Sequence, residues 1–340
     1  MKQTLLALLG IIFLSVPLVA KADQYGDFGY STNGSTATIT NYTGTGGSVV
    51  IPSAINGLSV TSIGYAAFYH STGLTSIVIP NSVTNIGTLA FAACYSLTNA
   101  TISNGVTSIG DLAFLFCYSL TSATIPASVT SIGGQAFDGC NSLTIVVDAA
   151  NTSFSSVDGI VFNKNQTAII LFPSGRLGSY IIPSSVTSIG DNAFADCSGL
   201  TNITIPNSVT SFGTRAFAFC TSLTSITIPS NVTNIGVEAF LECTSLTSVT
   251  IPSGVTSIGG GAFQNCYNMT NITIPASVTS IGDYTFQNCT GLTRRWWWQW
   301  RWCPNRGNAC SRDWIDQCSW RFGGKLFRLW SNPETESGWR

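Results

Sequence analysis

Charged side chains are scarce in this 340-residue chain: Asp, Glu, Lys and Arg make up 9% of it, against about a quarter in an average soluble protein. Between Asp23 and Thr293 those that occur are mostly acidic, with 11 acidic and 3 basic residues and hence a net charge of −8. This body lacks the basic surface that binds nucleic acid, so we exclude nucleic acid as a partner. Beyond the extreme N-terminus, the chain also lacks an apolar run long enough to cross a bilayer.

Histidine, the most frequent general acid or base, occurs only once, as His70. Any Ser-His-Asp or Cys-His relay would depend on that residue alone. Asp111, Asp191 and Asp283 share one position of a repeat but are separated by other residues, whereas Ca²⁺ needs several oxygen ligands around one ion. We therefore expect no enzymatic activity, no cofactor and no metal site.

The N-terminus has the pattern of an export signal. After one lysine, residues 5–19 are apolar, and Ala20 and Ala22 fit an A-x-A cleavage site. The short apolar run favours a secretory signal over a membrane anchor. We expect residues 1–22 to be a signal peptide, and the mature protein, which begins at Asp23, to be secreted or displayed on the cell surface.

A repeat of 23 residues occupies the chain from residue 63 to residue 293. An Ile-Gly pair, or Phe-Gly once, is followed by Phe four residues after the glycine and, in eight of nine units, by Cys seven residues after it. One step is longer because of a 34-residue insertion at about 144–178. The repeat glycines are Gly64, Gly87, Gly110, Gly133, Gly190, Gly213, Gly236, Gly259 and Gly282.

Each unit can be interpreted as one coil of a solenoid, for example LTSITIPSNVTNIGVEAFLEC at 223–243. Ile226 and Ile228 lie on one face of a short strand, which Pro229 ends. Phe240 and Cys243 have the spacing of a short helical turn. One coil cannot bury its apolar side alone, so we expect stacked parallel β coils with short helical turns and a continuous core containing a phenylalanine ladder.

The unit I-P-x-S-V-T-S-I-G-x-x-A-F-x-x-C-x-x-L-T-S resembles the BspA-like leucine-rich repeats of bacterial surface proteins. The resemblance extends from about Tyr42 to Thr293, and Ser103 replaces the usual proline in one unit. The insertion resembles a hairpin that these proteins carry between repeats. The resemblance implies a leucine-rich-repeat-like, curved solenoid, secreted or surface-displayed, that binds other macromolecules, without indicating which ones.

The segment 23–62 is expected to be an N-terminal β cap. Residues 25–30 and 36–41 are strand-like runs joined around Asn33-Gly34, which is a strong hairpin signal. A hairpin at this point would cover the otherwise open end of the stack.

Eight cysteines share one repeat position: Cys94, Cys117, Cys140, Cys197, Cys220, Cys243, Cys266 and Cys289. Export permits disulfides, but equivalent side chains in a parallel stack point the same way, which is poor disulfide geometry. We expect these residues to be buried free thiols that pack as small apolar groups.

The candidate binding site is a row of hydroxyl residues on the outward strand face. Threonine also simply suits an exposed strand, which is the alternative explanation for the row. The residues that we assign to the face are Thr101, Thr124, Thr204, Ser225, Thr227, Ser248, Thr250 and Thr273.

The leading hypothesis is a monomeric, non-enzymatic recognition or adhesion protein. It would bind an extracellular protein or glycan through this face, with the hairpin insertion as a second contact. The alternatives are an ice-binding protein or a purely structural surface-layer solenoid that uses the threonine ladder.

The repeat stops within one residue at Arg294, and all nine tryptophans lie at or beyond Trp296. Three interpretations are open: a membrane-interface segment, a natural C-terminal cap, or a change of reading frame. Tryptophan's only codon, TGG, reads GGT when shifted by one base, which encodes the glycine of a flexible linker. We favour the third, and so expect residues 294–340 to be disordered and functionless, without membrane contact. The last repeat would then be uncapped near Phe286 and Leu292.

Overall fold

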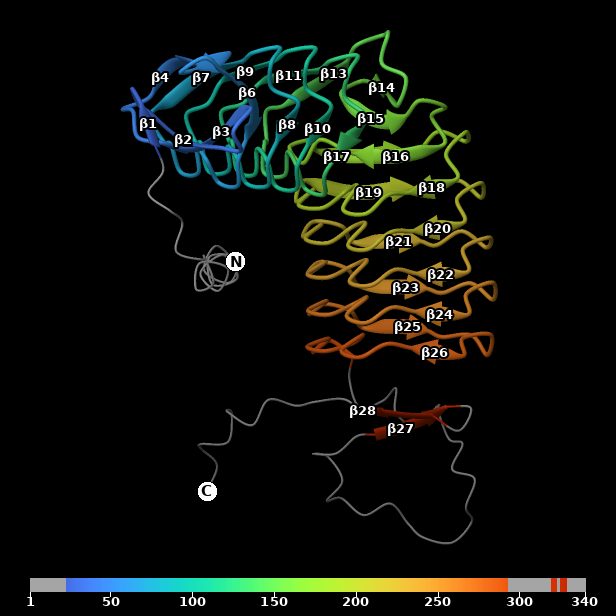
Figure 1. Cartoon of the computed structure of the whole chain (residues 1–340). Coiled ribbons are helices and arrows are strands. Elements are labelled where there is room, and N and C mark those ends of the chain that lie inside the picture. The colour runs from blue at the N-terminus through green and yellow to red at the C-terminus, as the bar shows by residue number, and fades with distance from the viewer. Residues whose placement is uncertain (1–22, 293–318, 323–324, 329–340) are drawn as a thin grey trace, which may run out of the picture.

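The computed structural model of the protein describes residues 23–292, 319–322 and 325–328 (Figure 1). The predicted signal peptide and most of the tail lie outside these residues, so both predictions stay open. Within the tail, β27 (Ser319–Phe322) and β28 (Lys325–Arg328) pair as an antiparallel hairpin. We did not predict this pairing from the sequence.

The solenoid begins with an antiparallel meander. β1 (Asp23–Tyr25), β2 (Phe28–Thr32) and β3 (Thr36–Tyr42) pair in sequence order. The side chain of Asn33 accepts two main-chain hydrogen bonds in the turn between β2 and β3. β3 then pairs in parallel with β6 (Leu58–Ile63), which joins the meander to the stack. The expected hairpin is present, and its capping role remains a prediction.

Each regular coil contributes two short parallel strands, which form two columns along the stack (Figure 1). The first strand column comprises β4 (Gly47–Val50), β7 (Leu74–Ile79), β9 (Asn99–Ile102), β11 (Ser122–Ile125), β13 (Thr144–Val147), β17 (Gly178–Ile181), β19 (Leu200–Thr204), β21 (Ser225–Thr227), β23 (Ser248–Thr250) and β25 (Asn271–Thr273). The second strand column comprises β6, β8 (Asn85–Ile86), β10 (Ser108–Ile109), β12 (Ser131–Ile132), β18 (Ser188–Ile189), β20 (Ser211–Phe212), β22 (Asn234–Ile235), β24 (Ser257–Ile258) and β26 (Ser280–Ile281). β5 (Ala54–Ile55) pairs antiparallel with β6. Coils are in register at the repeat length, because Ser225 pairs with Ser248 and Thr227 with Thr250.

The third side of each coil runs from the repeat glycine to the repeat cysteine, and we call it the turn edge. It contains no helix in any coil that the structure describes. Its alternate amides donate to the next coil, from Phe68 N to Ala90 O at 2.7 Å and from His70 N to Ala92 O at 2.9 Å. Residues two and six positions after the glycine have positive φ, such as 53° at Ala66. The predicted helical turn is therefore wrong, because left-handed residues interrupt it and the next coil satisfies its amides.

Phenylalanine rings stack along the axis of the solenoid. The centroids of Phe217 and Phe240 are 5.3 Å apart, with 1° between the ring planes, and those of Phe114 and Phe137 are 5.1 Å apart. Beside the rings, Cys243 Sγ donates to Phe217 O at 3.2 Å. The phenylalanine ladder predicted from the repeat is confirmed, and each rung packs against its two neighbours as a solenoid requires.

The insertion divides the stack into an N-terminal arm (23–147) and a C-terminal arm (178–292). β14 (Phe154–Val157), β15 (Ile160–Asn163) and β16 (Ala168–Leu171) form an antiparallel meander, and β16 pairs in parallel with β18. The buried apolar residues accordingly form two main clusters, one per arm, which meet at the insertion. In Figure 1 the two arms meet at a bend, with β14 and β15 on its outer side.

Candidate ligand-binding face

The candidate hydroxyl residues lie on the first strand column. In β21, Ser225 and Thr227 are exposed, while Ile226 between them is buried, as a period of two requires. β23 and β25 repeat this pattern. The residues that share this exposure are all eight candidates: Thr101, Thr124, Thr204, Ser225, Thr227, Ser248, Thr250 and Thr273. Their outward orientation is confirmed, whereas their binding role stays a prediction.

The threonines of a coil fall into two classes according to their hydrogen bonds. Thr247, just before β23, donates from Oγ1 to the carbonyl of Thr224 in the preceding coil at 3.1 Å. Thr256, just before β24, donates in the same way to Thr233 at 3.1 Å. Thr250 and the other candidate threonines make no side-chain hydrogen bond with any residue that the structure describes. The first class therefore ties coils together, and the second leaves its hydroxyls available to a ligand.

The hydroxyl row is not continuous along the molecule. The threonines of β21, β23 and β25 are in register, but the equivalent positions in β13 and β17 hold Val146 and Ile181. These two side chains are 54% and 72% exposed. The expectation of one ladder is thus corrected to two patches: Thr101 and Thr124 in the N-terminal arm, and four coils in the C-terminal arm. Exposed aliphatic side chains separate them where the insertion interrupts the repeat.

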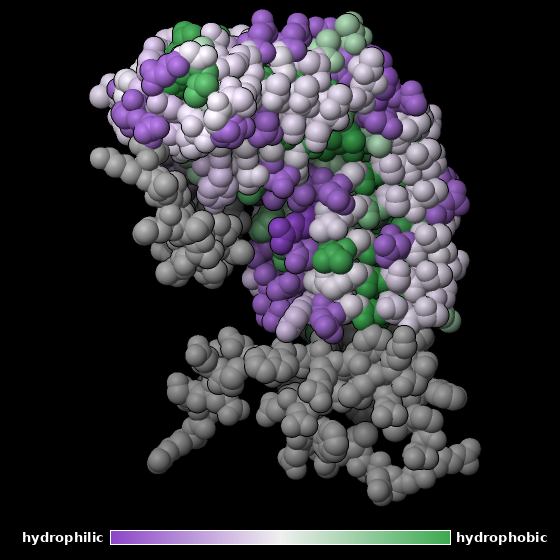
Figure 2. Space-filling model, viewed as in Figure 1, coloured by the Kyte–Doolittle hydropathy of each residue, from purple (hydrophilic) through white to green (hydrophobic). Residues whose placement is uncertain are grey.

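The surface around these patches is polar but almost uncharged. Figure 2 shows pale, weakly polar residues over much of the surface, with strongly hydrophilic residues gathered on the inner side of the C-terminal arm beside a line of hydrophobic ones. The single ion pair among the described residues joins Arg215 and Glu238 on the turn edge. Contacts on the first strand column would therefore depend on hydrogen bonds and shape, with little long-range electrostatic attraction.

The eight repeat cysteines are buried free thiols in the structure, as predicted. Burial raises the pKa of Cys94 and of Cys243, so the reactive thiolate is disfavoured. Cys289 in the last coil differs, because a hydrogen bond from Cys266 lowers its pKa. The cysteines thus act as packing groups.

Catalytic and metal-binding clusters were not expected from the sequence. His70 is exposed, and its ring lies 5.5 Å from that of Tyr95. Within the described ranges, no three His, Cys, Asp or Glu side chains gather in a metal-binding arrangement. Asp111 and Asp191 serve the scaffold, since each accepts a main-chain hydrogen bond from the following coil, at 2.8 Å and 2.7 Å.

The turn edge differs between the arms, which we did not predict from the sequence. In the N-terminal arm, Leu89, Ala92 and Leu115 form a small apolar cluster outside the main core, and Tyr95 and Tyr118 are stacked beside it with centroids 5.5 Å apart. The equivalent positions of the C-terminal arm include polar residues: Arg215, Glu238, Gln264 and Gln287. This difference could have been found in the sequence, by comparing the residues two and five positions after each repeat glycine in the two arms.

The family model for the BspA type leucine rich repeat region (6 copies) matches residues 47–169 and 170–293. The chain belongs to the BspA-type leucine-rich repeat family. The resemblance seen in the repeat unit is thereby confirmed. A comparison with curated proteins found no match.

Several solved structures resemble this BspA-type chain. A leucine rich cell surface protein from Faecalibacterium prausnitzii A2-165 is 29% identical, with a TM-score of 0.56 over 83% of this chain and 97% of that one. The pneumococcal vaccine antigen PcpA is 21% identical, with a TM-score of 0.59 over 78% and 86% of the two chains. A leucine-rich repeat protein from Eubacterium ventriosum ATCC 27560 is 23% identical, with a TM-score of 0.56 over 80% and 89%. The last two show that the solenoid fold is shared.

In the part that the structure describes, no helix has the length and apolar character needed to span a bilayer.

Proposed function

We propose that this BspA-type protein is a non-enzymatic recognition or adhesion protein, secreted or displayed on the bacterial surface. It binds an extracellular protein or glycan through the first strand column of its C-terminal arm. The observation that carries this proposal is the row of exposed threonines in β19, β21, β23 and β25, whose hydroxyls have no partner among the described residues. The similarity to a cell surface protein supports the location.

Hydroxyl chemistry suits such partners. A threonine hydroxyl donates one hydrogen bond and accepts two, so it can pair with sugar hydroxyls or with the main chain of an extended peptide. Coils spaced at about 5 Å would present these groups at regular intervals. Each hydrogen bond contributes only about 0.5–1.5 kcal/mol, so affinity requires several coils to engage together.

Ice binding and a purely structural surface layer are the alternative functions. An ice lattice requires a flat and unbroken array, whereas Val146 and Ile181 interrupt the row and the stack bends at the insertion. The interruption therefore favours a ligand that contacts one arm. An assay of ice-recrystallisation inhibition by the purified protein separates ice binding from recognition of a protein or glycan. Inhibition would favour the ice-binding alternative.

The experiment is a binding screen of the full chain against extracellular matrix proteins and glycans. Hits are then measured with the triple variant Thr227→Ala, Thr250→Ala and Thr273→Ala. The matched control removes three exposed hydroxyls from the loops after the first strand column: Ser230→Ala, Thr233→Ala and Ser253→Ala.

We expect the first triple variant to lose about tenfold or more in affinity, since three hydrogen bonds are removed. The control should remain within about twofold of the wild-type affinity, as expected for surface changes away from the site. Equal affinity in both variants would exclude this face as the site.

A further inference from the structure

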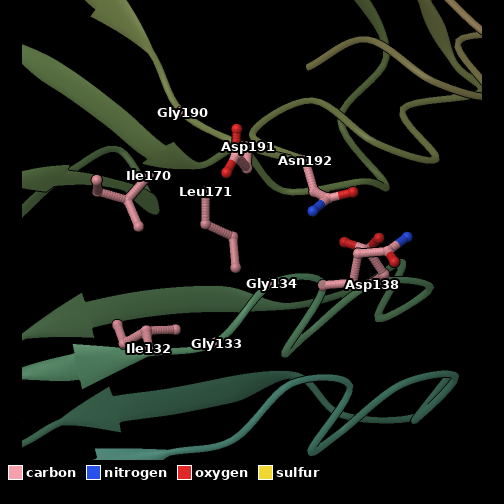
Figure 3. A pocket seen from close by; sticks show the side chains of 10 residues that line it. Ile132, Gly133, Gly134, Asp138, Ile170, Leu171, Gly190, Asp191 and Asn192 are labelled. Carbon is pink, nitrogen blue, oxygen red and sulfur yellow. The ribbon is translucent and has the colours of Figure 1, made fainter. Parts of the chain in front are cut away.

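The seam between the arms, where the coil of Gly133 meets the coil of Gly190, contains a partly open cavity of about 230 Å³ (Figure 3). Ile170 and Leu171 of the insertion form part of its wall. The insertion separates the coils on their strand sides and also enters the turn edge, where Phe172 N donates to Ala193 O. The two turn edges still meet at Gly134 and Asn192. A Cβ added to Gly134 would lie 3.1 Å from the side-chain nitrogen of Asn192.

Inter-coil hydrogen bonds are interrupted at this seam. In a regular pair of coils, the amide two residues after the repeat glycine donates to the next coil, as Leu89 N does to Asp111 O at 3.0 Å. The equivalent bond from Gln135 N to Asp191 O does not form between these described residues. In other coils this amide is hydrogen-bonded to the next coil. At the seam the Gln135 amide lacks that partner, and Gln135 lines the cavity.

Two side-chain oxygens at the seam are buried without a partner. Asp138 is only 5% exposed, and its Oδ2 has no hydrogen-bond partner among the described residues. Asn192 Oδ1, in the coil across the seam, is also buried and unpartnered in that part of the chain. Figure 3 shows the two side chains on facing walls of the cavity. Two acceptors that face each other need a group between them that can bind both.

A second carboxylate, Asp196, is not among the residues that line the cavity, but it lies close enough for its charge to act on Asp138. Burial, and then the charge of Asp196, raise the pKa of Asp138 well above its usual range, and burial raises the pKa of Asp196 to about 6. The only ion pair in the described ranges is the one between Arg215 and Glu238 on the turn edge, so no lysine or arginine there neutralises either carboxylate. No other repeat has an acidic residue at the position of Asp138, whereas the position of Asp196 is acidic once more, as Glu242. The departure at Asp138 thus places an acidic group at the seam, where an unpaired charge is costly.

We propose that the seam binds one hard divalent cation of the Ca²⁺ class, held by Asp138 and Asn192 from opposite sides, with the nearby carboxylate of Asp196 adding negative charge. Ca²⁺ accepts carboxylate, amide and main-chain oxygens together with water, and it tolerates irregular geometry, whereas Mg²⁺ demands a near-ideal octahedron. Two carboxylates and one amide oxygen supply charge and donors, and the cavity has room for several waters at about 30 Å³ each. The ion links the two arms, independently of any ligand on the first strand column.

The test is calorimetric titration of the full chain with CaCl₂ near neutral pH, and with MgCl₂ in parallel. We expect one Ca²⁺ site, weaker binding of Mg²⁺, and a higher melting temperature in CaCl₂ than in EDTA. Asp138→Asn and Asp196→Asn, which alter opposite sides of the seam, should each weaken Ca²⁺ binding by about tenfold or more. Asp283→Asn removes an exposed carboxylate in the last coil and should leave binding unchanged.

Both test variants are nearly isosteric and remove a buried charge, so their folding in EDTA is checked first by circular dichroism. The proposal is overturned if CaCl₂ gives neither heat nor a melting shift, or if Asp138→Asn binds Ca²⁺ as the wild type does. A wild-type protein that is stabilised by protons but not by Ca²⁺ would also overturn it. In that case the protonated carboxyl of Asp138 would donate a hydrogen bond to Asn192 Oδ1.

Discussion

The two arms have the same coil but not the same surface. Inside, the ladder of Phe68, Phe91, Phe114 and Phe137 in the N-terminal arm matches that of the C-terminal arm, with centroids near 5 Å apart in both. Outside, the turn edge of the N-terminal arm carries an apolar cluster and stacked tyrosines. The turn edge of the C-terminal arm carries an ion pair and amide hydrogen bonds.

The comparison separates what the repeat requires from what it permits. Positions that point inward are constrained by both neighbouring coils, so they stay apolar in nearly every coil, as Phe, Ile, Val, Leu, Ala, Met or Cys. Positions two and six residues after the glycine need only donate an amide to the next coil, and residues as different as Leu112 and Glu238 meet this need. The turn edge and the outward strand positions are therefore where the arms can acquire different partners.

The largest expected effect tests whether the two interiors are equivalent. Phe114→Ala and Phe217→Ala should each lower the free energy of unfolding by about 3–5 kcal/mol, because each leaves a cavity in a closed ladder. Hydrogen exchange should then show the larger loss of protection in the arm that carries the change, since each coil packs only against its neighbours. Equal loss of protection in both arms would show that they fold as one unit.

The next effect concerns the seam and its dependence on pH. The pKa of Asp196 is raised to about 6 by burial, so its contribution to stability is complete below the unfolded value near 4 and is lost as pH rises through about 6. In EDTA, the wild type should lose about 1–3 kcal/mol between pH 4 and pH 7 relative to Asp196→Asn. Urea unfolding at several pH values measures this difference, and parallel curves for the two proteins would contradict the burial of this carboxyl.

A smaller effect tests the two turn edges at one repeat position. Leu115 is 4% exposed in the apolar cluster, whereas Leu241, its counterpart in the C-terminal arm, is only partly buried. Leu115→Gln should cost about 1–2 kcal/mol, and Leu241→Gln should cost less than about 0.5 kcal/mol. Thermal unfolding of both variants gives the comparison, and equal costs would show that the edges do not differ in packing.

The smallest effect separates the two classes of threonine. Thr247→Ala removes a hydrogen bond to the preceding coil and should cost about 0.5–1 kcal/mol. Thr250→Ala, three residues later, removes an unpartnered hydroxyl and should change stability by less than about 0.5 kcal/mol. Chemical denaturation resolves the pair, and a larger cost for Thr250→Ala would place that hydroxyl in the scaffold.

The interior of the fold could be predicted from the sequence because every buried position recurs in each coil. The conformation of the turn edge could not be predicted, because the spacing of Phe240 and Cys243 suits a helix as well as two successive turns. Left-handed residues such as Leu89 and Phe116 carry no glycine signal.

The candidate site was predicted in part. Exposure of Thr227 followed from strand alternation, but the different roles of Thr247 and Thr250 depend on inter-coil distances that composition does not encode. The burial of Asp138 could not be foreseen either, because it results from two coils that the insertion separates in sequence.

The division of hydrogen bonds between neighbouring coils also has a mechanical consequence. One coil of 23 residues occupies about 5 Å of the stack, but the same residues span roughly 75–80 Å when drawn out. Tension applied between the ends of the solenoid would act on every interface, but an end coil is held by one neighbour only, so it would peel away while the others keep their structure. A protein that joins a cell to a partner in flowing liquid would then lengthen in steps under strain, and the bond at its binding face would be protected from sudden force.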